Sequence, residues 1–169
     1  LLVWHVVSLC VGSELVLVST VKVVQTLFTV IFDPDFLKTV WYSAARILGG
    51  FFTALTLGTV LGWVASRFWV VETLLHPITT VIKATPVASF IILVLLWFSG
   101  KNLSVIISML MVFPVIYMNV LEGIRSADEK LLEMAQVFRL SVGKKLLYIY
   151  LPAVAPFFVS ACSVSLGLC

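Results

Sequence analysis

The sequence predicts an all-α integral membrane protein with several membrane-spanning helices. Of its 169 residues, 62% are hydrophobic and only 11% are charged, whereas soluble domains carry about 25% charged and about half apolar residues. The mean hydropathy is +1.17, and the charged residues fall between long uncharged runs. This composition excludes a water-soluble enzyme, a disordered tail, a disulfide scaffold and a nucleic-acid-binding module.

The uncharged runs define the expected elements, because a membrane-spanning helix needs about 20 apolar residues. We expect five spans, one interfacial helix and one charged loop within a single membrane domain over residues 1–169. The spans are 1–13, 44–66, 78–98, 103–121 and 148–169, the interfacial helix is 15–32, and the loop is 122–147. Because the chain begins at Leu1 and ends inside an apolar run at Cys169, we expect a membrane domain truncated at both ends.

The loop 122–147 sets the orientation of the chain. It holds nine of the nineteen charged residues, and five of the nine are basic. The positive-inside rule therefore places this loop in the cytoplasm. Counting back along the spans, we expect a loop at 67–77 on the cytoplasmic side and a loop at 32–43 on the outer side.

Small residues recur at every fourth position of the 44–66 span. They are Gly50, Ala54, Gly58 and Gly62. Residues four apart lie on one helix face, and small side chains let a second helix approach closely. We expect this face to pack against another helix of the same chain, while a dimer contact and a pore lining are the alternatives.

The cytoplasmic loop contains a short amphipathic helix. Ser126 and Glu129 have the spacing of a capping box, so we expect the helix to start near Ala127. Its apolar residues, which fall on one face, are Leu131, Met134, Ala135 and Phe138. Such a face has to pack on the membrane domain or on a partner protein, and a solvated charged loop is the alternative.

The spacing of this loop is similar to that of a known family. The sequence runs Glu133-Met134-Ala135, three residues, Arg139, nine residues, and then Ile149, one residue, Leu151-Pro152. It resembles the signature loop of ABC-importer permeases, which reads E-A-A, three residues, G, nine residues, I-x-L-P. Every spacing matches, and two identities depart: Met134 replaces a small residue, and Arg139 stands where the family has glycine.

Further segments resemble the nitrate/sulfonate/taurine branch of that family over roughly residues 37–169. They are Ser43-Ala-Ala-Arg46, Pro77, Lys83, Pro86, Trp97-Phe-Ser-Gly100, Asn119, Gly123, Asp128, Pro156 and Gly167. The resemblance implies a type I ABC-importer permease fold in the bacterial plasma membrane. It also implies a pore made with a second permease chain, as a homodimer, for a small anion or a related small organic compound.

The resemblance implies the partners and their contact residues. ATP and Mg²⁺ would bind to a separate ATPase subunit, with no cofactor on this chain, and an extracytoplasmic solute-binding protein would deliver the substrate. The residues expected to couple to the ATPase are Glu133, Met134, Ala135, Phe138, Arg139, Ser141 and Gly143, and Ile149, Leu151 and Pro152 end the motif. Without glycine at 139, we expect Gly143 to absorb the bend.

Two basic residues fall inside expected spans, and we expect both to snorkel. Lys83 would reach the cytoplasmic surface and Arg46 the outer one, although either could instead attract an anionic substrate. We find no catalytic cluster, metal site or P-loop, and no residue that identifies a substrate site. The alternatives to a permease are an intramembrane enzyme and a structural membrane protein that packs through the small-residue face.

Overall fold

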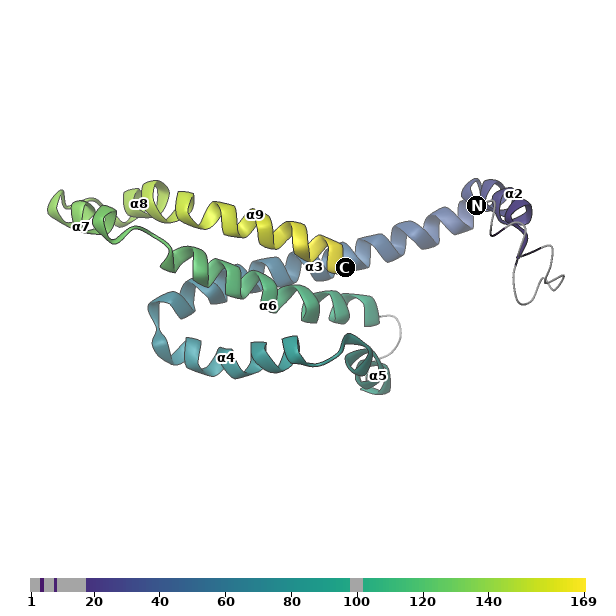
Figure 1. The fold of residues 1–169 in the computed structure, drawn as a ribbon, viewed down its shortest axis with the longest axis horizontal. Helices are drawn as coiled ribbons and strands as arrows, with labels where there is room; N and C mark the ends of the chain where they lie inside the picture. Colours follow the sequence, from purple (N-terminus) through teal and green to yellow (C-terminus); the bar gives the residue numbers. More distant parts are fainter. Residues whose placement is uncertain (1–3, 5–7, 9–17, 98–101) are drawn as a thin grey trace. The chain divides into compact units, whose positions relative to one another are not determined.

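The computed structural model describes residues 4, 8, 18–97 and 102–169, and this part of the chain is almost entirely helical (Figure 1). The expected span 1–13 lies outside the described residues except for Trp4 and Ser8. The chain divides into two compact units, Leu1–Ala44 and Ala45–Cys169, and the candidate site lies within the second.

The first unit contains α2, Thr20–Ile31, and the start of α3, Pro34–Arg67. Helix α3 begins ten residues before the expected start of the 44–66 span, so the expected outer loop 32–43 is largely helical. The local sequence explains this start. Pro34 occupies the first helical position, where its missing N–H costs nothing, and the Asp33 carboxylate accepts a hydrogen bond from the Asp35 N–H at 3.1 Å.

The second unit is held together by close packing of α3 on α6, Leu103–Arg125. A Cβ added at Gly50 would lie 2.6 Å from the Val105 carbonyl oxygen, and one at Gly58 would lie 3.0 Å from the Ile116 Cβ. The small-residue face thus packs against α6 of the same chain. A larger side chain would force the two helices apart.

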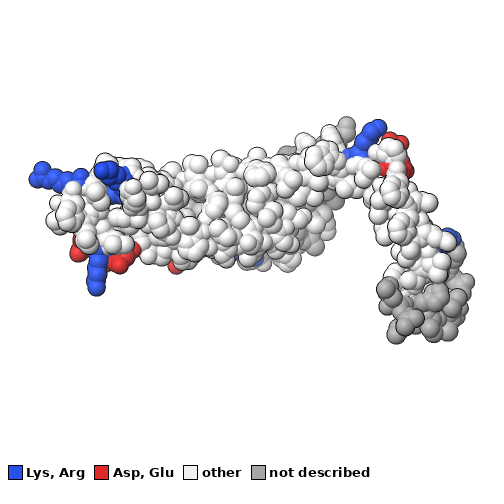
Figure 2. All heavy atoms as spheres, turned by 90° about the horizontal axis from the view of Figure 1, so that it is seen from above, with Lys and Arg blue, Asp and Glu red and all other residues white. Residues whose placement is uncertain are grey.

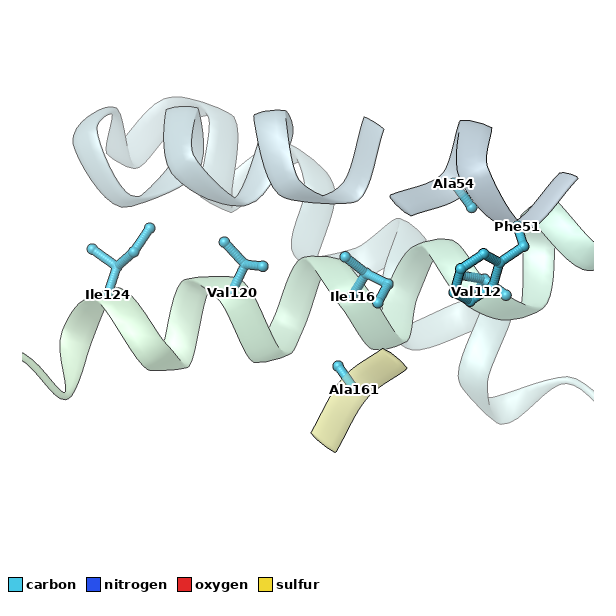
Figure 3. Close-up of a cluster of buried hydrophobic side chains, with 7 residues drawn as sticks. All are labelled: Phe51, Ala54, Val112, Ile116, Val120, Ile124 and Ala161. Atoms are coloured by element: carbon cyan, nitrogen blue, oxygen red, sulfur yellow. The ribbon is translucent and has the colours of Figure 1, made fainter. Parts of the chain in front are cut away.

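The core of this unit follows one stripe of α6. Its side chains, spaced four residues apart, point at α3 and at α9, Leu151–Leu168 (Figure 3). The cluster consists of Phe51, Ala54, Val112, Ile116, Val120, Ile124 and Ala161. Because Val112 and Ile116 are fully buried, α6 is the central helix of the unit.

The expected span 78–98 is two helices rather than one. Helix α4 is Trp69–Ala84, helix α5 is Val87–Trp97, and Thr85 and Pro86 separate them. A residue before proline is pushed out of the helical region, and Thr85 has the extended angles φ −86° and ψ 129°. Because α4 starts directly after Phe68, the expected cytoplasmic loop 67–77 is also helical.

The last helical stretch is continuous from Val142 to Leu168 and contains α8, Val142–Lys145, the π-helical segment η1, Leu146–Tyr150, and α9. Together with Pro34–Arg67 and Leu103–Arg125, it gives three described helices long and apolar enough to cross a membrane. The expected spans 44–66, 103–121 and 148–169 fall on these three helices.

Candidate functional site in the connection between α6 and α9

The candidate site is the segment that joins α6 to α9 at one end of the second unit (Figure 1). It contains α7, Glu129–Val137, a turn at 138–140, and α8. On the face shown in Figure 2, charged side chains gather at this end, while the apolar helices next to it carry few. The segment therefore lies where the chain leaves its apolar environment.

Helix α7 is capped by Asp128 rather than by Ser126. The Asp128 carboxylate accepts a hydrogen bond from the Lys130 N–H at 2.9 Å, and its extended backbone, φ −64° and ψ 120°, is typical of an N-cap. Ser126 instead ends α6, and its hydroxyl donates to the Gly123 carbonyl at 2.9 Å. The predicted capping box of Ser126 and Glu129 is wrong because α6 continues to Arg125.

The turn after α7 is made by Arg139, which has a positive φ of 48°. Its N–H donates to the Gln136 carbonyl at 3.0 Å, and the Leu140 N–H donates to the Ala135 carbonyl at 2.9 Å. These two bonds form a Schellman motif, in which the residue at Arg139 is usually glycine. The expectation that Gly143 absorbs the bend is wrong, since Gly143 lies within α8 without a positive φ.

Ala135 lies inside the chain. It is 1% exposed and forms a small core with Ala127 and Ile149, against which Leu132 and Leu140 pack. The expectation that Ala135 faces a partner is therefore not met in this structure. Its small side chain instead lets α7 approach the start of the last helix closely.

Beside buried Ala135, α7 and its C-cap residue Phe138 expose large apolar side chains, which we call the α7 apolar face. The exposed fractions are 47% for Leu131, 54% for Met134, 79% for Val137 and 71% for Phe138. Exposed apolar groups that gather in one place mark interaction surfaces. Glu133, Ser141 and Gly143 are also exposed, so these expected coupling residues are open to a partner.

The end of the motif shapes the start of the last helix. Pro152 has no N–H, so the Tyr148 carbonyl cannot receive the usual bond from four residues ahead. Here the chain widens into η1, and the Leu151 N–H donates to the Leu146 carbonyl, five residues back. Ile149 is 8% exposed within the Ala135 core, while Leu151 is 55% exposed.

An ion pair that the sequence did not reveal joins α4 to α6. The Arg125 guanidinium lies 2.6 Å from the Glu72 carboxylate, and the two side chains are 54% and 21% exposed. The sequence gives little sign of this pair. Glu72 in the first turn of α4 and Arg125 in the last turn of α6 each interact favourably with the dipole of their own helix, so neither charge requires a distant partner.

Lys83 lies far from this ion pair. It is in the last turn of α4, eleven residues after Glu72 and thus about 16 Å along the axis. It lines a cavity of about 230 Å³ together with Thr85, Met111 and Pro114. The expectation that Lys83 snorkels to the cytoplasmic surface stays a prediction; its side chain is exposed, at the end of α4 that lies farther from Glu72.

Comparison with protein families identifies the fold. A family model described as binding-protein-dependent transport system inner membrane component matches residues 54–168. The chain belongs to this family. The match includes α6, the whole α6–α9 connection and α9. This family of inner membrane components consists of transport permeases. The described residues fit a membrane component, since they include three helices long and apolar enough to cross a membrane.

Three curated relatives carry related names. The putative aliphatic sulfonates transport permease protein SsuC of Bacillus subtilis is 30% identical over 169 residues, which are 98% of this chain and 61% of the relative. The taurine transport system permease protein TauC of Escherichia coli is 25% identical over 98% of this chain and 62% of the relative. A probable ABC transporter permease protein of Haemophilus influenzae is 27% identical over 58% of this chain and 40% of the relative. The chain thus spans about three fifths of the length of the first two.

Proposed function

We propose that this chain forms the membrane-spanning part of an ATP-driven, binding-protein-dependent importer and that α7 couples it to a separate ATPase subunit. The observation that carries the proposal is the α7 apolar face, which points out of the chain next to the charged end that the positive-inside rule assigns to the cytoplasm. A partner protein would remove this face from water.

The packing of α7 gives a route for coupling. Ala135 and Leu140 hold α7 against Ile149, so a push on α7 is passed to the start of the last helix. That helix packs closely on α6: a Cβ at Gly123 would lie 3.0 Å from the Val154 Cα. Movement of the ATPase would therefore reach α6, the central helix of the unit, through rigid contacts.

The energy source lies on the partner. The proposal assigns ATP and Mg²⁺ to the ATPase subunit and no cofactor to this chain, whose sequence contains no P-loop. It also includes a second copy of this chain, with which the first would enclose the path, and a soluble protein that delivers the solute from outside.

We assign the substrate to the class of small sulfonate-type anions. Two relatives are named for aliphatic sulfonates and taurine. The cavity at Lys83 supports this class, because a lysine that lines a cavity of a membrane protein offers a positive charge to an anionic solute. Among the described residues, no acidic side chain forms an ion pair with Lys83.

The proposal is tested by retention of the ATPase subunit on the affinity-tagged chain in nanodiscs. Two matched pairs of variants separate the contact from general damage. Glu133→Gln is compared with Glu129→Gln, since each removes one negative charge from α7, and Phe138→Ala is compared with Leu147→Ala, since each truncates an exposed apolar side chain.

We expect Glu133→Gln and Phe138→Ala to reduce ATPase retention about tenfold, which corresponds to about 1.4 kcal/mol, while both controls retain it. Sulfonate-stimulated ATP hydrolysis, measured with the solute-binding protein present, should fall in parallel. Equal retention by Phe138→Ala and Leu147→Ala would overturn the assignment of α7 as the coupling element.

A further inference from the structure

A second, larger cavity lies in the same unit, between the ends of α3 and α6 and the segment α7 to η1. Its volume is about 600 Å³. The polar and aromatic side chains that line it are Trp63, Ser66, Arg67, Gln136, Lys145 and Tyr150. Neither the family signature nor the proposed coupling surface accounts for this combination.

The cavity has an aromatic wall and a basic mouth. The rings of Trp63 and Tyr150 meet edge to face, with centroids 5.6 Å apart and an interplanar angle of 77°. Trp63 and Arg67 are four residues apart in α3, so they share one helix face. Lys145 and Tyr150 are five residues apart across η1. Because hydrogen bonds in a π-helix join residues five apart, these two side chains lie on the same side of the helix.

Both helices therefore present an aromatic ring and, one turn closer to α7, a cation. Helix α3 runs toward α7 and ends at Arg67, while the last helical stretch starts beside α7 and reaches Lys145 before Tyr150. Arg67 and Lys145 line the same cavity, and along its helix each is one turn closer to α7 than the aromatic residue.

These two cations lack a counter-charge among the described residues. Neither Arg67 nor Lys145 forms an ion pair with a described acidic side chain. Lys145 is partly buried, whereas Arg67 and Lys144, the neighbour of Lys145, are exposed. Two like charges that line one partly enclosed space repel each other, so an anion between them would lower the electrostatic energy.

The position of the cavity relative to the membrane–water boundary indicates where that anion comes from. Tryptophan and tyrosine gather at membrane–water boundaries, and here the cations lie on the polar side of the aromatic pair, at the end of the apolar part of α3. Basic pockets between helices on the cytoplasmic side are typical sites for phosphate-bearing lipid headgroups.

We infer that this cavity binds a tetrahedral oxyanion through Arg67 and Lys145, with the Gln136 amide as a further donor, and that the cytoplasmic leaflet supplies it as the phosphate of an anionic phospholipid. A soluble phosphate offers the same chemistry from a second source. The occupant would link α3 to α7 through Gln136. The bound anion would thereby restrict the movement of α7 without contacting the α7 apolar face.

The experiment measures lipid binding by native mass spectrometry of the full chain released from detergent. Phosphatidylglycerol is titrated against the neutral lipid phosphatidylcholine. The test variant is Arg67→Gln with Lys145→Gln, and the matched control is Lys130→Gln with Lys144→Gln, which removes the same charge from exposed positions outside the cavity. A second arm measures the rise in thermal unfolding temperature caused by inorganic phosphate in lipid-free detergent.

We expect phosphatidylglycerol to bind at least tenfold more weakly to the test variant than to the control, with phosphatidylcholine unchanged. The charge-preserving variant Arg67→Lys with Lys145→Arg should restore most of the binding, and circular dichroism should show the same helix content in all variants. Stabilisation by phosphate alone that is lost in the test variant would support the oxyanion site with a soluble source. Equal responses of the test and control variants in both arms would overturn the inference.

Discussion

Replacing Arg139 by glycine should stabilise the turn that positions α7. Arg139 has a φ of 48°, and the left-handed conformation costs a non-glycine residue about 1–2 kcal/mol. Glycine removes that cost but loses roughly 0.5–1 kcal/mol more backbone entropy on folding. The net gain is about 0.5–1 kcal/mol, or roughly a two- to fivefold shift in the local opening equilibrium.

The assay is amide hydrogen exchange of the chain in nanodiscs. The informative amides are those of Arg139 and Leu140, which donate to Gln136 and Ala135. We expect about two- to fivefold slower exchange at both in Arg139→Gly. Arg139→Ala should leave it unchanged, because alanine keeps the same steric cost.

Two results would refute this reasoning. Faster exchange in Arg139→Gly would show that the positive φ carries no cost here, and equal slowing in Arg139→Ala would assign the effect to the side chain. ATPase retention adds a separate readout. If Arg139→Gly keeps its protected turn but loses the ATPase, the arginine side chain is itself a contact.

Three further predictions concern packing and charge. Gly58→Ala should lower the unfolding temperature in detergent, with a loss of about 1–3 kcal/mol from overpacking, because its Cβ would lie 3.0 Å from Ile116; Gly49→Ala, with nothing within 4 Å, should not. Ala135→Leu should reduce ATPase retention although the residue is only 1% exposed, and unchanged retention would count against the fixed position of α7. Lys83→Met should lower sulfonate-stimulated ATP hydrolysis at least tenfold while the ATPase stays bound, and Lys83→Arg should preserve it; equal activity of the two would remove Lys83 from the substrate path.

Much of the helical framework could be predicted because its signals are local. The apolar runs that contain α6 and α9 are long enough to see in the sequence, and the four-residue repeat at Gly50 and Gly58 showed which face of α3 would be approached closely. The helix boundaries were harder. The predicted span 78–98 ignored that Pro86 excludes Thr85 from the helical region, which divides the segment into two helices.

The sequence by itself determined the apolar character of the chain, the charged connection between α6 and α9, and the spacing from Glu133 to Pro152, because each depends on composition or on neighbours along the chain. Only the tertiary structure decided that Ala135 faces Ile149, that Arg139 makes the glycine-type turn, and that Arg67 and Lys145 share one cavity. The physical reason is that burial and electrostatic pairing depend on distances in space. Nothing in the sequence indicates that a residue in α3 and a residue in α8 will lie close together in the folded chain.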